Sequence, residues 1–450
     1  DTAEEPAMIV HIGGGKTLKF TKCGSGLYYF DTSKPSNSDI MGYSFFSTVR
    51  QHKDYFTKKE IAGADKARIL QSNIGWPSTS DLKHYIASNQ IVNCDVTVDD
   101  VNRAEAIYGP QVPLLKGKMV RRRPEHYANV PRVPIPAPIL EHHPTDEINM
   151  DFMFVNGTPF LHTKSSVMKF LSVQKCQGRG RQEMIRGIDR VTSKFTQRGF
   201  SIAAYNGDNE FEKLRDHLSP TTLNIVARGE HVGPIERSIR TIKERVRCSC
   251  QGLPYKRIPK IMTQSIVESS VTWLNAFPAK EGASKTLSPS AIILGTPKPD
   301  HSKLKITFGA YAQAYESTTN TTQARSIGAI ALKPSNERGG YYFMSLSTGR
   351  RIHCYQWTEL PIPDYIIDRV EALAEGERQP IMTNGHPIFE WSPGVPILDE
   401  DGAGGEGEDH DGDEVENDGQ PYDYDTDEEE AEDNDESIVG DAGPFDNEDS

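Results

Sequence analysis

The pattern of apolar and polar residues divides the chain into helical and strand-forming stretches. From residue 49 to 109, runs of helix formers predict a small helical module, with Thr57 as the N-cap of one helix. From 148 to about 280, apolar strand-like runs give way to helical runs, which predicts an α/β domain. From 285 to 365, apolar and polar residues alternate in a way typical of a small β module.

Within the α/β domain, the predicted order is three strands, a helix, a strand and further helices. The apolar runs that predict strands are 148–155, 159–164, 167–174 and a run ending near Tyr205. The helical runs are 181–197, 210–218, 234–250 and 260–277.

Three carboxylates are distinguished by their places in these elements. Asp151 lies inside the apolar run 148–154, where a buried charge is costly unless a metal ion or another partner neutralises it. Asp208 follows a predicted strand, and Glu236 lies near the start of a helical run. Oxygen ligands of this kind suit Mg²⁺ or Mn²⁺. Two such ions, roughly 4 Å apart, activate an attacking hydroxyl and stabilise the leaving oxygen of a phosphodiester.

Glu236, Arg240 and Lys243 recur at i, i+4 and i+7, which places them on one face of a helix. A salt-bridged surface helix has the same pattern. The spacing alone therefore leaves a structural and a functional interpretation open.

The motifs around these acids resemble those of DDE integrases from Copia-type long-terminal-repeat retrotransposons. The resemblance rests on MDFMFVNGTPFL around Asp151, GDNEF around Asp208 and GPIERSIRTIKE around Glu236. It continues through LSPS at 287–290 and GRR at 349–351, and it covers roughly residues 50–365. The ER-x-x-RT-x-K-E run is its most specific part.

The resemblance implies a ribonuclease-H-like α/β core with a mixed sheet flanked by helices. It implies divalent-metal-dependent 3′-end processing and strand transfer of DNA, with Asp151, Asp208 and Glu236 as the catalytic residues that hold two Mg²⁺ or Mn²⁺ ions. The partners would be the element's DNA ends, target DNA and further copies of the chain, with no small-molecule substrate. It also implies release from a polyprotein and action in the nucleus, reached through cytoplasmic particles.

One spacing departs from the family pattern. Asp151 and Asp208 are separated by 56 residues, as the family expects, but Asp208 and Glu236 are separated by only 27. The family's usual second gap is longer by roughly two helical turns of about 3.6 residues each. A shortened loop is the favoured explanation; alternatively Glu230 or Glu244 is the working acid, or the element has decayed.

Several groups of cations are candidates for contacts with DNA phosphates, which add salt-sensitive affinity. They are Arg237, Arg240 and Lys243 beside Glu236; Arg186, Arg190 and Lys194 on the helix at 181–197; Arg121, Arg122 and Arg123 in a Pro-rich connector; and Arg350 and Arg351 at a β-module turn. A solvated helix face, a solvated linker or a packing module without DNA contact would show the same residues.

The net charge hides a division of the chain. The formal charge is −14, but residues 399–450 hold 25 Asp and Glu and no Lys or Arg, so the first 398 residues carry 50 basic against 39 acidic residues, a net of +11. A basic body fits a polyanionic partner. The acidic segment has too few apolar residues to form a core and is predicted to be disordered.

The six cysteines form no disulfide framework and no CxxC pair, which predicts a reducing compartment. Related integrases carry a zinc module near residues 49–109, but the ligands in this region are His52, His84 and Cys94 alone. Because a closed structural zinc site needs four ligands, apolar packing without zinc is expected. No apolar run is long enough to predict a membrane span.

The domain boundaries follow from these patterns. They are a β-rich lead-in at 1–48, a helical pre-integrase-like module at 49–109, a Pro-rich basic linker at 110–147, the integrase-like core at 148–282, a C-terminal β module at 283–371 and a disordered acidic tail at 372–450.

Two other functions remain open. One is a catalytically decayed relative that binds nucleic acid, which the short second gap favours. The other is a nuclease of the same fold that cuts RNA–DNA hybrids, which would require a fourth carboxylate from Asp189 or Asp216.

Overall fold

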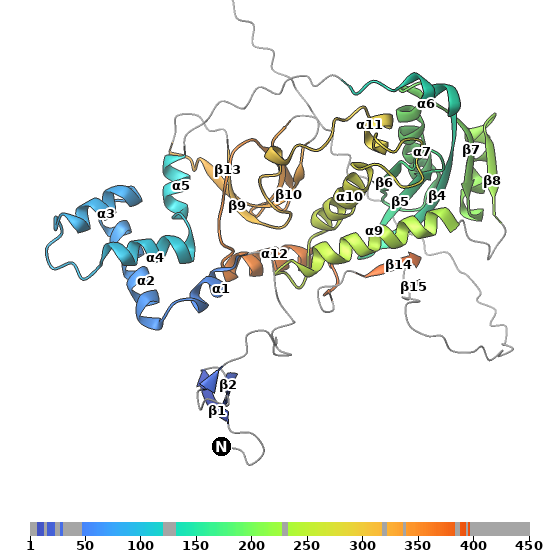
Figure 1. The fold of residues 1–450 in the computed structure, drawn as a ribbon. Coiled ribbons are helices and arrows are strands. Elements are labelled where there is room, and N and C mark those ends of the chain that lie inside the picture. The colour runs from blue at the N-terminus through green and yellow to red at the C-terminus, as the bar shows by residue number, and fades with distance from the viewer. Residues whose placement is uncertain are drawn as a thin grey trace, which may run out of the picture. The chain divides into compact units, whose positions relative to one another are not determined.

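The structure is a computed structural model. It describes residues 7–12, 16–22, 28–29, 47–119, 132–226, 233–316, 322–335, 339–382, 388–392 and 395–396, and only the backbone of the strands before residue 30 and after residue 388. Figure 1 shows these elements as a ribbon. Among them, no helix has the length and apolar character needed to cross a membrane.

The main sheet is built around one central strand, β4 (Thr145–Val155). β5 (Thr158–Ser165) pairs antiparallel with one edge of β4, and β6 (Leu171–Lys175) pairs antiparallel with β5. On the other edge, β7 (Ser201–Gly207) runs parallel to β4, and β8 (Thr222–Ile225) runs parallel to β7. The predicted strands of the core are confirmed, and the sheet begins three residues before the predicted boundary.

The C-terminal region adds an edge to this sheet. β14 (Phe389–Ser392) pairs with the far end of β4, where Phe389 lies opposite Val155, and β15 (Val395–Pro396) pairs with β14. Disorder from residue 372 onward is therefore wrong for these strands. The reason is that β7 covers β4 only up to Asn149, so the end of the long strand is open to a second partner. Residues 399–450 lie outside the described residues.

The two faces of the sheet are covered by different helices. Phe152 and Phe154 share one buried cluster with side chains of α7 (Arg181–Thr196). Met153 and Val155 point the opposite way, because successive side chains of a strand alternate. They share the other cluster with α9 (Gly233–Gln251) and α10 (Lys260–Asn275). The predicted helices of the core are confirmed, except that 209–214 is 3₁₀ (η1, Asn209–Leu214) before a short α8 (Arg215–Leu218).

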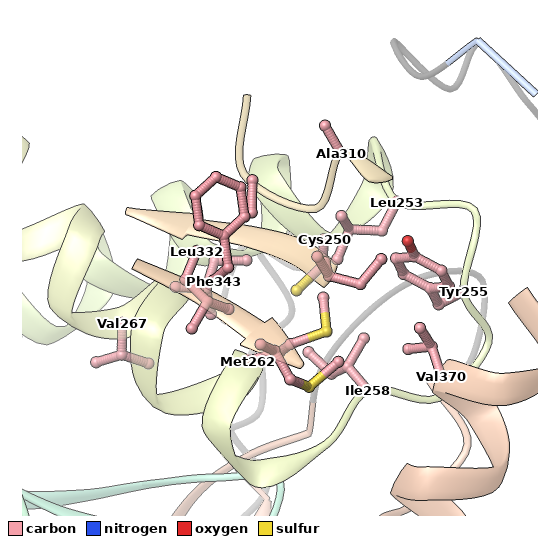
Figure 2. Packing of buried hydrophobic residues seen from close by; sticks show 14 of the residues in the cluster. Cys250, Leu253, Tyr255, Ile258, Met262, Val267, Ala310, Leu332, Phe343 and Val370 are labelled. Atoms are coloured by element: carbon pink, nitrogen blue, oxygen red, sulfur yellow. The ribbon is translucent and has the colours of Figure 1, made fainter. Parts of the chain in front are cut away.

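The β module shares its core with the main sheet. Cys250 and Met262 of the core helices lie in one apolar cluster with Leu332, Phe343 and Val370 from the C-terminal region (Figure 2). The module is a five-stranded antiparallel sheet in the order β12-β11-β10-β9-β13. Its strands are β9 (Tyr311–Tyr315), β10 (Ser326–Pro334), β11 (Tyr341–Ser345), β12 (Arg351–Cys354) and β13 (Trp357–Glu359), followed by α12 (Asp364–Gly376).

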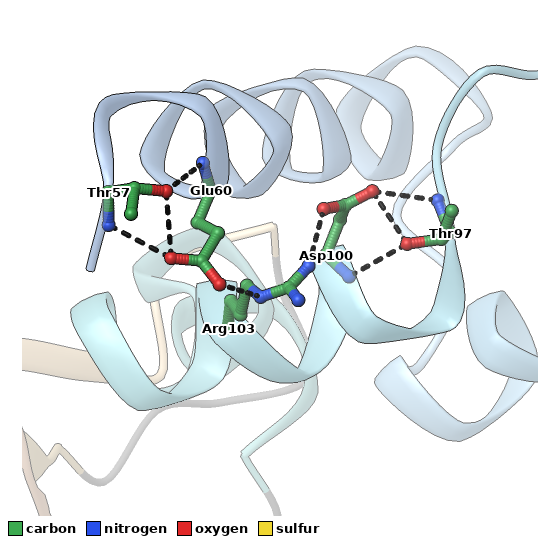
Figure 3. Close-up of polar contacts among 5 residues, drawn as sticks. All are labelled: Thr57, Glu60, Thr97, Asp100 and Arg103. Atoms are coloured by element: carbon green, nitrogen blue, oxygen red, sulfur yellow. Dashed lines mark hydrogen bonds and ion pairs between the residues drawn. The ribbon is translucent and has the colours of Figure 1, made fainter. Parts of the chain in front are cut away.

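The helical module has a small apolar core of its own, formed around Leu82 and Ile107. Two capping boxes begin its longer helices, with Thr57 capping at Glu60 and Thr97 capping at Asp100. Arg103 joins them, because it lies 3.5 Å from Glu60 and 3.1 Å from Asp100 (Figure 3). The predicted helices are confirmed as α1 (Val49–Asp54), α2 (Lys58–Asn73), α3 (Thr79–Ala87) and α4 (Val98–Tyr108).

Helices also occur where a Pro-rich linker was expected. α5 (Val112–Lys118) and α6 (Ala137–His142) each carry proline in the first turn, where a missing N–H costs nothing. α11 (Pro289–Ile293) begins the same way, and Ile292 and Ile293 pack in the α7-side cluster. The core therefore extends beyond its predicted end at residue 282. The remaining elements are β1 (Ala7–Ile12), β2 (Lys16–Lys22), β3 (Tyr28–Tyr29) and η2 (His301–Lys303).

Asn275 fixes the last turn of α10 against the sheet edge. Its amide accepts from Leu171 N at 2.9 Å and donates to Leu171 O at 2.7 Å, and it is buried. We predict that Asn275→Ala lowers the free energy of unfolding by about 2–4 kcal/mol, because both backbone groups of Leu171 lose their partner in a buried place. Urea denaturation followed by circular dichroism measures this. Asn73→Ala, at the exposed end of α2, is the matched control and should change it by less than about 0.5 kcal/mol; an equal effect of both substitutions would contradict the assignment.

Candidate functional site

Asp151 and Asp208 lie just beyond the paired part of two neighbouring parallel strands. The pairing of β4 with β7 ends where Asn149 is opposite Asn206. Asp151 follows two residues later on β4, and Asp208 directly follows the end of β7. Both carboxylates therefore belong to the same end of this strand pair. Asp208 is held at the end of β7 because it caps η1, where its Oδ1 accepts from Glu210 N at 3.1 Å.

A buried histidine connects the same level of the sheet to α9. His162 on β5 is the cross-strand partner of Asp151 and is fully buried. Its Nδ1 donates to Ser172 O at 3.0 Å, and its Nε2 accepts from Ser238 Oγ at 2.7 Å. Burial lowers the pKa of His162 to about 4, so the ring is neutral at pH 7. Ser238 is two residues after Glu236, so this bond holds the first turns of α9 over the sheet level that carries Asp151.

Neighbouring acids act on Asp151 through their charge. Burial raises the pKa of Asp151 from 3.8 to about 7, against the opposing effect of Phe152 N, which donates to Asp151 Oδ1 at 2.7 Å. Nearby negative charges add to the rise, and they come from Asp208, Glu236 and Glu210. Like charges at short range disfavour ionisation of all of them. A cation placed among these carboxylates would reverse this effect.

The donor set suits a divalent cation in its chemistry, because carboxylate oxygens are the ligands that Mg²⁺ and Mn²⁺ prefer. The distances are less favourable. Within the part of the chain that the structure describes, no three His, Cys, Asp or Glu side chains converge closely enough to hold one ion. The acids thus share an electrostatic neighbourhood without forming a closed coordination sphere.

Glu210 is a fourth carboxylate that sequence reasoning missed. It raises the pKa of Asp151 by its charge. Its own pKa is raised, mainly by burial and less by Asp208, while Arg179 opposes the rise through an ion pair of 3.3 Å. Only its place two residues after Asp208, within GDNEF, could have signalled it.

The two residues considered earlier for a fourth acid lie elsewhere. Asp189 pairs with His217 at 2.8 Å, and Asp216 is exposed on α8. The structure therefore corrects this choice: the fourth acid near Asp151 is Glu210.

Glu236 is the acid of α9 that acts on Asp151. It lies in the first turn of the helix and is partly buried. Glu244, one of the two alternatives, lies on the same helix with its side chain exposed and is absent from the charges that shift Asp151. Glu230, the other alternative, lies outside the described residues.

The cations predicted beside Glu236 differ in their exposure. Arg237 and Arg240 are exposed on α9. Lys243 is only 7% exposed, so its prediction as a DNA contact is wrong. The spacing placed Lys243 correctly on the same helical face as Glu236. That face is more deeply buried at Lys243 than at Glu236.

Sequence reasoning also missed Lys164, a cation on the same sheet face as Asp151. It lies on β5 opposite Asn149, two residues from His162. Burial lowers its pKa, as do the charges of Lys169 and Arg237. The charge of Glu281 opposes this shift. Lys164 and Arg237 are therefore close enough to act on each other, and Arg237 follows Glu236 directly on α9.

The cations predicted on α7 belong to the other face of the sheet. Arg186 and Arg190 are exposed, and Arg186 pairs with Glu183 at 2.9 Å. Lys194 is partly buried, with Nζ 5.7 Å from the Phe170 ring centroid. Because α7 and α9 cover opposite faces, the α7 cations are not part of the group around Asp151.

The other residues considered as DNA or zinc contacts lie outside the sheet and helices that carry the three acids. Arg350 and Arg351 are exposed beside the turn between β11 and β12. In the helical module, His52 Nδ1 lies 3.1 Å from Ile107 O and Cys94 Sγ lies 3.7 Å from Val96 O, while the ring of His84 lies beside Tyr85. Arg121, Arg122 and Arg123 lie outside the described residues.

No family model matches the chain, and no curated protein matches it either. Solved structures do. The catalytic core domain of BIV integrase is similar at 18% identity and a TM-score of 0.25, over 35% of this chain and 98% of that one. The HTLV-2 integrase catalytic core domain in complex with magnesium, in its trimeric form, is similar at 14% identity and a TM-score of 0.25, over 33% of this chain and 97% of that one.

The raised pKa of Asp151 predicts a characteristic pH dependence of stability. Between pH 3.8 and about 7 the folded protein holds a proton that the unfolded chain releases, so this group lowers the free energy of unfolding as pH rises through that window. We predict that in EDTA at pH 8 Asp151→Asn is more stable than wild type by about 2 kcal/mol, allowing for its partial exposure to solvent. The difference should vanish near pH 4.

Urea denaturation at pH 4, 6 and 8 measures this dependence. Asp54→Asn, an exposed carboxyl at the end of α1, is the control and should give the same stability as wild type across the range. A variant of Asp151 that is less stable than wild type at pH 8 would show instead that a cation of the protein already neutralises the carboxylate.

Proposed function

We propose that this chain is a DNA integrase that processes DNA 3′ ends and transfers them to target DNA with divalent cations bound by Asp151, Asp208 and Glu236. The observation that supports this best is that the charges of Asp208 and Glu236 both act on Asp151, together with the His162–Ser238 bond that holds the helix of Glu236 against the cross-strand partner of Asp151. Two separate parts of the fold thus act to gather three carboxylates.

The carboxylates would hold Mg²⁺ or Mn²⁺, two ions in all, which lower the pKa of a water or a DNA 3′-hydroxyl and stabilise the departing 3′-oxygen. The protein's own residues orient the DNA. Arg237 and Arg240, exposed on α9, would neutralise backbone phosphates, together with Lys164, on which the charge of Arg237 acts. Asp151 must be ionised to act as a ligand. Its raised pKa therefore predicts that activity increases from pH 6 to 8, and that this pH dependence weakens as cation binding lowers the pKa of Asp151.

Finer features of the proposal come from the motifs quoted above. They are a Copia-type retrotransposon origin, processing from a polyprotein, assembly as a homo-multimer on DNA ends, and action in the nucleus. Arg350 and Arg351 are proposed as additional DNA contacts of the β module. The exposed pair Arg186 and Arg190 would contact DNA only on the opposite side of the sheet.

A second function is a catalytically decayed relative that binds nucleic acid without cutting or joining it. Two observations favour it: the 27-residue gap between Asp208 and Glu236, and the lack of a closed coordination sphere among the described residues.

Strand transfer tests the proposal directly. The full chain is incubated with a labelled duplex DNA end, a plasmid target and Mg²⁺ or Mn²⁺, and joined products are resolved on a gel. We predict that Asp208→Asn and Glu236→Gln each lower transfer by on the order of 10²–10³-fold, because each removes a ligand of the cations that would stabilise the transition state. Glu244→Gln, on the same helix but exposed, is the matched control and should keep wild-type transfer.

The other outcomes are distinct. Salt-sensitive DNA binding with no transfer by any protein would favour the decayed relative. Cleavage of an RNA–DNA hybrid without transfer of duplex ends would favour a nuclease, and loss of this cleavage in Glu210→Gln would then assign the fourth acid.

Cation binding can be measured apart from activity. We predict that Mg²⁺ or Mn²⁺ at ten times its dissociation constant stabilises wild type by about 1.4 kcal/mol, which raises the thermal midpoint by a few degrees, and that EDTA reverses this shift. The shift should be lost in Asp208→Asn and kept in Glu244→Gln. A shift of equal size in both variants would place the cation elsewhere.

A further inference from the structure

A row of aromatic side chains lies on the β module, outside the group of acids. Tyr342 on β11 and His353 on β12 are cross-strand partners, with ring centroids 5.2 Å apart. The ring of Tyr355, just after β12, meets His353 edge-on at 4.7 Å and 89°. The guanidinium of Arg351 lies 5.0 Å from the Tyr342 ring centroid. One edge of the module therefore carries three rings and a stacked cation in sequence.

This row is open to solvent. Tyr355 is 50% exposed, Arg351 is exposed, and Tyr342 and His353 are partly exposed. β12 is the last strand on its side of the five-stranded sheet. Exposed rings of this size lose favourable burial, so their gathering at one edge indicates a ligand that covers them.

Backbone contacts hold the rings in place. His353 Nε2 donates to Gly339 O at 2.7 Å. Gly340 has φ +68°, and a Cβ at this position would lie 2.5 Å from Cys354 O and 3.1 Å from Tyr355 Cδ1. Only glycine allows the turn to approach this closely. The row is thus fixed before any ligand binds, which lowers the entropy cost of binding.

We propose that Tyr342, His353 and Tyr355, with Arg350 and Arg351, form a platform on which unpaired bases of a nucleic-acid strand stack. Rings offer their faces to bases of any sequence, and exposed arginines attract the phosphates that join those bases. The two adjacent positive charges make a basic protein partner unfavourable. A duplex keeps its bases stacked inside, so it could use the arginines but not the rings.

This inference goes beyond the proposed function and does not depend on the carboxylates. If the chain is an integrase, the platform would hold a frayed or overhanging strand near a DNA end. If the chain only binds nucleic acid, the platform would be one of its binding sites. Its test is therefore run in EDTA, where strand transfer cannot contribute.

The test compares binding of a labelled 20-nucleotide single strand and of the matching duplex to the full chain, by fluorescence anisotropy at fixed salt. We expect Tyr355→Ala and Tyr355→Leu to weaken single-strand binding by about tenfold, the loss of one stacked base, and duplex binding by less than about twofold. Tyr355→Leu keeps most of the apolar area, so weaker single-strand binding by this variant would show that the aromatic ring itself is needed. Tyr355→Phe should bind as wild type.

Two further variants complete the design. Tyr55→Ala is the matched control, because Tyr55 is 85% exposed in the helical module, and it should leave both affinities unchanged. Arg351→Gln should weaken both ligands and reduce the salt dependence of binding by about one ion. Comparing the affinity for an RNA strand of the same sequence with that for the DNA strand shows which nucleic acid supplies the bases. A preference for either single strand supports the platform. Unchanged single-strand binding by Tyr355→Ala, or equal losses for single strand and duplex, would overturn the proposal.

Discussion

The central strand β4 is the constraint on which the rest of the structure depends. It is paired along its first half with β7, at its far end with β14 and from Ile148 to Val155 with β5. Its side chains enter two separate apolar clusters on alternate sides. A shift of one residue in its pairing would move Met153 and Val155 to the α7 side and turn Asp151 into that cluster. Packing therefore fixes which face carries the carboxylate and which helices can reach it.

This arrangement requires the fold to tolerate repulsion. Three other carboxylates raise the pKa of Asp151, and the charges of Lys169 and Arg237 lower the pKa of Lys164. Burial adds to both shifts, and the charge of Glu281 opposes the shift of Lys164. Perturbed groups of this kind gather at functional sites, where a side chain must interact with a ligand as well as with the fold.

Much of the fold could be predicted from local pattern, because the strand 148–155 and the helix 181–197 have clear periodicity. The misses have physical causes. The prolines in the first turns of α5 and α6 were interpreted as marking a linker, although proline is compatible with the start of a helix. The strand β8 has only four residues, too few to show alternation. β14 pairs with residues more than 230 positions earlier in the chain, which no local pattern can show.

The candidate site was predictable to a different degree. Motif resemblance selected Asp151, Asp208 and Glu236, and the charges of the last two act on Asp151 in the structure. Spacing identified the helical face of Lys243 but not its depth, since burial depends on what packs against the helix. No local pattern in the sequence distinguishes Lys164 and His162, because their relation to the site depends on which residues of β4 lie opposite them.

The sharing of one apolar cluster has a consequence for how nucleic acid can lie on the protein. α10 packs against β6 and also against β10 of the C-terminal module, and Met262 of α10 lies near Leu332 and Phe343 of the module (Figure 2). The module and the main sheet thus contribute to one apolar cluster. Separating them would expose this interior and cost roughly 25 cal/mol for each Å² of apolar surface uncovered. A strand on the proposed aromatic row would therefore bind to a module that is packed against the helices covering the face of Asp151, whereas α7 covers the opposite face of the sheet.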